Sequence, residues 1–340
     1  MSETQLTNFI GWLQEATYGT DPNPNSNTHY KLGKNVIGDY PRVQRNVQIN
    51  HNNNYQPSER ITTKHIVQGN IAFEPVNSLA LKYLFTQVDG TGISEAAGVF
   101  TIDPSAIAVN GQRNSWAWRS DLGNSTENIR AHYLGNMVIR YQEGMNFIGG
   151  SDQRLLAGID YIGQKRATPA TDVSNPPIYP DIGTTNDNEH FKKDGNTVLS
   201  WDGDTMLPQV VQFNHTISNE PQSHPVDGQR HVERVTTGNQ TYGLTLNVRR
   251  AGGFSKQLDV DYADQLINDT TGKTLVFQIY NTASLYKKYT YTDCGITDMV
   301  KNIIIDSDFI AHPTYQVTMA PLTMVAEFKD GLNKTTFYNL

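Results

Sequence analysis

An internal repeat constrains this chain more than any other feature of its sequence. The segment ERITTKHIVQG, Glu59 to Gly69, aligns without a gap with ERVTTGNQTYG, Glu233 to Gly243. Both copies place Glu and Arg before a β-branched residue and two threonines, and both reach a glycine ten positions after the glutamate. The offset (233 − 59 = 174) is about half of the 340 residues, so the repeat predicts two similar domains in tandem.

Alternation of apolar and polar residues predicts that both domains are mainly β. Thr, Val, Ile and Tyr are frequent, and Gly and Asn separate the alternating runs. We expect strands at corresponding places in the two halves: 42–50, 61–75, 115–122, 136–144 and 154–166 in the first, and 208–217, 233–250, 274–281, 296–305 and 315–328 in the second.

One short helix is expected in each half, after the repeated strand. The first runs from an Asn77 N-cap to Gly90, and the second runs from Asp259 to the turn at Gly272, after the intervening RAGGFSKQ. The expected apolar faces are Leu81, Leu84, Phe85 and Val88 in the first helix, and Ala263, Leu266 and Ile267 in the second.

The stretch between the halves is rich in proline and lacks periodicity, which is typical of a linker. We therefore expect a first domain with an N-terminal arm over residues 1–163, a linker over 164–198 and a duplicated second domain over 199–340. Each domain would be a β-sandwich or half-barrel with one short helix and one long polar hairpin.

Motifs for catalysis, cofactors and metals are missing from the sequence. TGKT at 271–274 resembles a phosphate-binding loop, but Ile267 stands where that motif needs glycine. The spacing of His224, His231 and Glu233 matches no standard zinc site. We predict no enzymatic activity, no cofactor and no metal. The single cysteine, Cys294, is expected in the core.

Charge and hydropathy disfavour two classes of partner. The net charge is −7, and Lys and Arg form no cluster of the kind that binds phosphates tightly. No apolar run is long enough to cross a bilayer, so we expect a soluble chain that does not insert into a membrane.

Two long polar hairpins, at 51–60 and 218–234, join strands at the same place in the two halves. Long connections at equivalent positions favour a functional role, and their polar composition suits docking on a neighbouring molecule. The candidate assembly residues are His51, Asn53, Tyr55, Glu59, Arg60, Glu220, His224, Asp227, Arg230, Glu233 and Arg234.

Three segments carry a resemblance to a known family. GWLQEATYGTDP, Gly11 to Pro22, resembles the E-x-T/S-x-G-T-x-P entry segment of tail tube proteins from long-tailed bacteriophages and archaeal tailed viruses. The strand and helix expected over His65 to Gly90 are similar to those that follow the stacking loop in that family. YLGNMVIRYQEG, Tyr133 to Gly144, resembles its later glycine-led strand.

The resemblance implies a structural virion protein that assembles into rings, which stack into a tube that conducts DNA. Ring closure pairs strand edges that would otherwise invite aggregation. Rings of the family usually have six single-domain subunits, so a two-domain chain is expected to form trimers with pseudo-sixfold symmetry, with hexamers of the chain as the alternative. Expected partners are further copies, tape-measure, terminator and baseplate proteins, and passing DNA. The expected location is the virion tail, after assembly in the host cytoplasm.

Two other functions stay open from the sequence. A capsid or sheath protein would share the β content and the absence of a catalytic motif. A carbohydrate-binding β-sandwich module would use Trp116 and Trp118, which fall on the same side of a strand, to stack on sugars.

Overall fold

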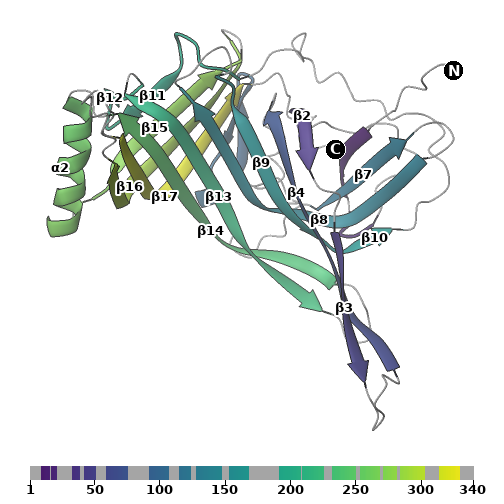
Figure 1. Cartoon of the computed structure of the whole chain (residues 1–340). Coiled ribbons are helices and arrows are strands. Elements are labelled where there is room, and N and C mark those ends of the chain that lie inside the picture. The colour runs from purple at the N-terminus through teal and green to yellow at the C-terminus, as the bar shows by residue number, and fades with distance from the viewer. Residues whose placement is uncertain are drawn as a thin grey trace, which may run out of the picture.

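The structure of the chain is a computed structural model (Figure 1). It describes residues 9–15, 17–20, 33–38, 42–50, 59–75, 92–106, 115–123, 128–147, 153–167, 191–207, 209–225, 232–249, 253–268, 271–281, 284–302 and 314–329. These residues form an antiparallel sheet of 17 strands, one α-helix and one short 3-10 helix. The expectation of a mainly β fold is confirmed.

The long strands agree with the expected positions and extend several of them. Those of the first half are β3 (Arg42–Asn50), β4 (Glu59–Pro75), β7 (Trp116–Gly123), β8 (Asn128–Asn146) and β9 (Leu156–Gly163). Those of the second half are β13 (Val210–Pro225), β14 (Val232–Arg249), β15 (Lys273–Tyr280), β16 (Tyr286–Asn302) and β17 (Thr314–Lys329).

Shorter elements flank these strands. They are β1 (Phe9–Gln14), β2 (Gly33–Gly38), β5 (Ile93–Ala96), β6 (Val99–Ile102), η1 (Pro104–Ala106), β10 (Lys165–Ala167), β11 (Val198–Trp201) and β12 (Asp204–Thr205). The segment expected as a linker thus begins with β10, which pairs with β8, and contains the core residue Phe191. No described helix has the length and apolar character needed to cross a membrane.

The two halves connect their long strands in the same order. In the first half β3 pairs with β4, β4 with β9, β9 with β8 and β8 with β7. In the second half β13 pairs with β14, β14 with β17, β17 with β16 and β16 with β15. The sequence repeat therefore lies on β4 and β14, the second strand in two series of strands that pair in the same order.

Two β-bulges also recur at matching places in β8 and β16. The first contains Gly135 (φ 66°) in β8 and Asp293 (φ 52°) in β16, at a numbering offset of 293 − 135 = 158. The second shifts the register at Ile139 in β8 and at Thr297 in β16, at the same offset (297 − 139 = 158). Because a bulge leaves one residue unpaired and bends its strand, matching bulges give β8 and β16 the same course.

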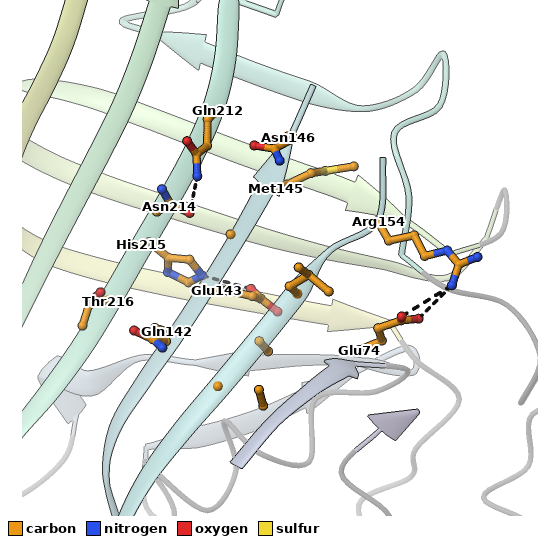
Figure 2. Close-up of a pocket in the computed structure, with 15 residues that line it drawn as sticks. Glu74, Gln142, Glu143, Met145, Asn146, Arg154, Gln212, Asn214, His215 and Thr216 are labelled. Carbon is orange, nitrogen blue, oxygen red and sulfur yellow. Dashed lines mark hydrogen bonds and ion pairs between the residues drawn. The ribbon is translucent and has the colours of Figure 1, made fainter. Parts of the chain in front are cut away.

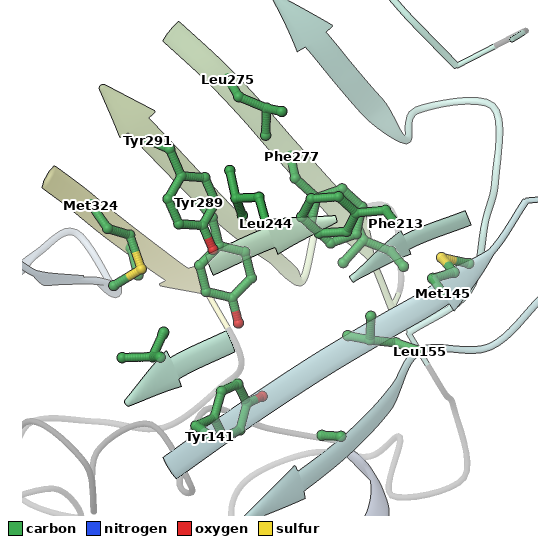
Figure 3. Packing of buried hydrophobic residues seen from close by; sticks show 14 of the residues in the cluster. Tyr141, Met145, Leu155, Phe213, Leu244, Leu275, Phe277, Tyr289, Tyr291 and Met324 are labelled. Atoms are coloured by element: carbon green, nitrogen blue, oxygen red, sulfur yellow. The ribbon is translucent and has the colours of Figure 1, made fainter. Parts of the chain in front are cut away.

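The halves join directly through β8 and β13. Residues 140–146 of β8 pair antiparallel with residues 212–218 of β13, so one sheet runs through both halves. The sheet also curls: Phe213 of β13 and Phe277 of β15 have ring centroids 4.5 Å apart, although β14, β17 and β16 lie between their strands in pairing order. A single hydrophobic cluster therefore includes residues from both halves (Figure 3).

The helix α2 (Gly253–Asn268) begins earlier than expected and buries a different face. It starts within RAGGFSKQ, because Leu258 is fully buried and anchors the first turns. Asp261 is also buried, where it accepts hydrogen bonds from Trp201 Nε1 (2.7 Å) and from Gln257 (2.9 Å). Leu266 and Ile267, expected on the buried face, are 66% and 79% exposed. The helix expected near Asn77 lies outside the described residues.

The N-terminal motif residue Glu15 is a buried anchor for three segments. Its carboxylate accepts hydrogen bonds from the Gly19 amide (2.8 Å), the Ser115 hydroxyl (2.5 Å) and the Gly135 amide (2.8 Å). Gly19 has φ 68° and lies against Gln164, so a side chain there would meet both strain and a clash. The Glu and Gly of the motif therefore tie the segment after β1 to the bulge in β8.

We expect Gly135→Ala to destabilise the chain more than Gly98→Ala does. Both glycines have positive φ (66° and 76°), which costs an L-residue about 1–2 kcal/mol. A Cβ at Gly135 would lie 2.6 Å from Cβ of Gln164, whereas one at Gly98 meets nothing within 4 Å. Urea unfolding of both variants isolates the clash, and equal midpoints would show that the bulge tolerates a side chain.

Candidate functional site

The two polar hairpins form two-stranded arms that project from the sheet (Figure 1). The first arm consists of β3 beyond Val43 and the part of β4 before Val67, where pairing with β9 begins. The second arm consists of the distal parts of β13 and β14, beyond Ser218 and before Leu244. Within the described residues, each arm pairs only with itself. The expected loop at 218–234 is therefore mostly strand.

Prolines in the second arm coincide with irregular pairing. The register of β13 against β14 shifts between Asn219 and Pro221 and again between His224 and Pro225. Proline has no amide hydrogen and is tolerated in sheets at bulges and edges, so a strand continues here despite a loop-like composition.

The structure places some of the candidate assembly residues on the arms. Glu59 pairs with Asn50, and His224 pairs with Arg234. Arg60 and Glu233 lie in β4 and β14, and Glu220 is exposed at the first bulge of β13. The other candidates, His51, Asn53, Tyr55, Asp227 and Arg230, lie outside the described residues.

The tryptophans considered for sugar binding are core residues. Trp116 and Trp118 are 0% and 2% exposed, and the Trp118 ring lies 5.3 Å from Tyr133 and 6.5 Å from Tyr161 between centroids. A carbohydrate-binding face at this strand is therefore wrong, because neither indole presents a face to solvent. Cys294 is buried as expected, and its burial raises the pKa of the thiol to about 12.

A buried polar cluster lies beneath the junction of the halves. The Glu143 carboxylate of β8 accepts hydrogen bonds from Lys287 Nζ (2.8 Å), from the Tyr289 hydroxyl (2.6 Å) and from the Tyr141 hydroxyl (2.6 Å). His215 of β13 lies 2.9 Å from the same carboxylate through Nε2 and bonds Tyr291 through Nδ1. Figure 3 shows the three tyrosines of this cluster among the core residues.

Protonation states within this cluster follow from its contacts. Burial alone would raise the pKa of Glu143, but Lys287 and His215 outweigh it and hold that pKa far below its usual range. Burial first, and then the Glu143 charge, raise the pKa of Tyr289 well above its ordinary value. Both ring nitrogens of His215 have a partner, Nε2 the Glu143 carboxylate and Nδ1 the Tyr291 hydroxyl.

Sequence reasoning missed this cluster, although a signal was present. Glu143 alternates with Tyr141 and Met145 on the core side of β8, and His215 alternates with Phe213 and Ile217 on the core side of β13. A charged residue in register with apolar ones indicates a buried, partnered group.

The opposite face of this junction is polar and holds a pocket of about 410 Å³. Gln142 and Asn146 of β8 and Gln212, Asn214 and Thr216 of β13 line it, and the Glu74–Arg154 ion pair (3.3 Å) stands at its rim (Figure 2). Among the described residues, no group of three or more His, Cys, Asp or Glu side chains is placed to hold a metal ion.

Comparison with protein families gives a match over most of the chain. A family model described as phage tail tube protein matches residues 6–317, which is nearly the whole chain. No curated protein matches the chain.

We expect Lys287→Met to lower the free energy of unfolding by about 3–5 kcal/mol at pH 7, because it leaves the buried Glu143 charge without its ammonium partner. Lys288→Met is the matched control, since that neighbouring lysine only joins a partly exposed pair with Glu327 (3.1 Å) and should cost under about 1 kcal/mol. The double variant Glu143→Gln/Lys287→Met removes both charges and should recover much of the loss. Urea unfolding measures all three, and equal effects at 287 and 288 would contradict the buried pair.

The same cluster predicts how stability depends on pH. Because the pKa of Glu143 is lowered in the folded state, its contribution is complete above the ordinary glutamate pKa of about 4.3 and is lost as the pH falls below it. The wild-type chain should therefore lose more stability between about pH 5 and pH 2 than Lys287→Met does. Parallel acid profiles for the two would argue against a depressed pKa.

Proposed function

The chain belongs to the phage tail tube protein family and is thus a structural component of a viral tail, and from this we propose that it forms rings of three copies that stack into a DNA-conducting tube. Family membership implies self-assembly into a tube and association with other tail proteins. The arrangement of three copies rests on one observation, the matching of the two halves in connectivity and bulges.

Two equivalent halves per chain let three chains supply six equivalent positions. We infer that residues 1–163 and 199–340 are duplicated tail-tube domains joined through 164–198, which packs in part against the sheet. The pairing of β8 with β13 then represents one contact between neighbouring domains of a ring. A closed ring repeats that contact by rotation, which yields a cyclic assembly.

The arms are the proposed contacts between successive rings. Both project beyond the part of the sheet that pairs with other strands, and both come from the same place in their halves. Their unpaired outer backbone and polar composition suit docking on a neighbouring ring.

The polar face of the sheet is the proposed lining of the bore. Outward side chains are uncharged over residues 212–218 of β13, 245–247 of β14 and 316–318 of β17: Gln212, Asn214, Thr216, Ser218, Thr245, Asn247, Gln316 and Thr318. Each lysine or arginine that neutralises a phosphate adds affinity, so a lining of amides and hydroxyls lets DNA slide. Tape-measure, terminator and baseplate proteins are the proposed partners at the tube ends, and assembly takes place in the host cytoplasm.

Electron microscopy of the purified protein tests the ring. We expect hollow tubes built from rings with sixfold-like density, and native mass spectrometry of released rings should show three chains of 38.0 kDa. Rings that contain six chains would contradict the trimer and leave the tube standing.

We expect Glu233→Ala/Arg234→Ala to shorten tubes while rings still form, because these residues lie on an arm distant from the sheet core. Lys288→Ala/Glu327→Ala, which removes an ion pair on the sheet face, is the control and should leave tube length unchanged. Tube lengths measured in negative stain decide between them. Loss of rings in the arm variant would mean that the arm acts within a ring.

A further inference from the structure

β8 and β16 are equivalent strands, and in each the edge away from β9 or β17 pairs first with β7 or β15. This edge is paired further along in β8 than in β16. That edge of β8 pairs with β7 up to Asn136 and then with β13 from Arg140 to Asn146. The same edge of β16 pairs with β15 up to Cys294. From Asp298 to Asn302, β16 pairs only with β17 on its other side, as far as the described residues go.

We propose that residues 298–300 of β16 pair antiparallel with residues 42–44 of β3 in a second copy of the chain, repeating between chains the start of the β8–β13 pairing seen within one. The inference rests on the proposed self-assembly and adds which edges meet and in which register. In the second copy, β3 pairs only with β4 as far as the described residues go. The edge of β3 away from β4 is therefore available for this pairing.

The register follows from the two sets of pairings. Ile71 of β4 pairs with Ile159, and Leu246 of β14 pairs with Val317. The offset between these two partners (317 − 159 = 158) equals the offset between the bulges of β8 and β16, so Ile71 and Leu246 occupy equivalent places. Val67 and Tyr242 lie four positions earlier in each strand and are therefore equivalent as well. This structural offset (242 − 67 = 175) is one residue larger than the offset of 174 in the sequence repeat.

The pairings within the two hairpins give the equivalent positions in β3 and β13. Val43 pairs with Val67, and Ile217 pairs with Tyr242, so Val43 corresponds to Ile217. Ile217 also pairs with Tyr141 of β8, whose counterpart in β16 at the same offset (141 + 158 = 299) is Met299. The proposed junction thus sets Val43 of one copy opposite Met299 of the next, an apolar pair in place of the buried pair Ile217 and Tyr141.

Exposed apolar residues gather at these two edges. Of the nine large apolar side chains exposed in the described residues, five lie there: Ile37 on β2, Val300 on β16, and Val260, Leu266 and Ile267 on α2. The helix α2 lies against β16 through the Lys301–Asp259 ion pair (2.7 Å) and through Gln265, which accepts from the Ile296 amide (2.7 Å). Apolar side chains concentrated beside an unpaired edge indicate a surface that is covered in the assembly.

The contact between α2 and β16 leaves the proposed pairing site open. Gln265 occupies the backbone at Ile296, before the bulge at Thr297. In β8 the matching residues, 137–139, also have no pairing with β13, which starts at Arg140. Through Gln265, α2 therefore bonds a stretch of β16 whose counterpart in β8 does not pair with β13.

Cysteine cross-linking tests the register in assembled tubes. Residues directly opposite in antiparallel strands have Cα atoms about 4.5–5.5 Å apart, within disulfide range. Val43→Cys/Met299→Cys should therefore give covalent oligomers up to a closed trimer on mild oxidation. Val47→Cys/Met299→Cys is the matched control, because its β3 cysteine lies four positions, roughly 13 Å, from the partner position. The native Cys294 is buried and should not cross-link.

Each outcome decides the inference. A non-reducing gel that shows oligomers with the 43/299 pair, and few with the 47/299 pair or either single variant, supports the junction. Tubes in the micrograph without cross-linking of the 43/299 pair, or with equal cross-linking of both pairs, overturn the junction while the proposed function stands. Absence of rings and tubes from the wild-type protein would overturn the proposed function, and the junction with it.

Discussion

The pairing of β8 with β13 is the constraint on which the rest of the structure depends. β8 is 19 residues long, and no single neighbour covers its edge, so its C-terminal part needs a second partner for its backbone groups. β13 supplies that partner and brings the second half against the first. The curl of the second sheet then carries β15 and β16 over β8, which places Phe277 and Lys287 in the shared core. Without this pairing neither sheet would close around its apolar face.

The buried carboxylate fixes the register of that pairing. Side chains alternate between the faces of a strand, so a slip by one residue would move Glu143 to the polar face and bring Gln142 or Gly144 into the core. Lys287, His215 and the Tyr289 hydroxyl would then be left without their shared acceptor. Apolar residues alone would penalise a slip less steeply, because they interact without direction. The cluster therefore contributes to choosing one pairing as well as to its strength.

Sequence patterns predicted the strands better than they predicted contacts between them. Alternation located one end of each of the ten long strands within a few residues, but it missed the first half of β16, where Lys287 and Lys288 interrupt the pattern. Lys287 faces the core only because Glu143, 144 residues away, lies across from it, and no local pattern carries that information. The apolar face of α2 was misplaced for the same reason, since Asp261 is buried by its bond to Trp201. The strands of the first arm were predicted in place, but the arm part of β13 was expected as a connection, and several of the arm residues chosen from the sequence fall outside the described residues.

The junction within a chain, β8 with β13, differs from the proposed junction between chains, β16 with β3. The difference suits a chain that folds before it assembles. The position in β16 that corresponds to Glu143 is Lys301 (143 + 158 = 301), which is partly exposed and bonds Asp259 of α2. The junction between chains therefore lacks the buried carboxylate and its four partners, and it relies on apolar contact and backbone pairing. Within a chain, β8 and β13 are also held at high effective concentration by the connecting segment. The ionic cluster thus favours the pairing of β8 with the β13 of its own chain over the β3 of another. The open edge of β16, which carries no such cluster, is left as the site where the next copy adds.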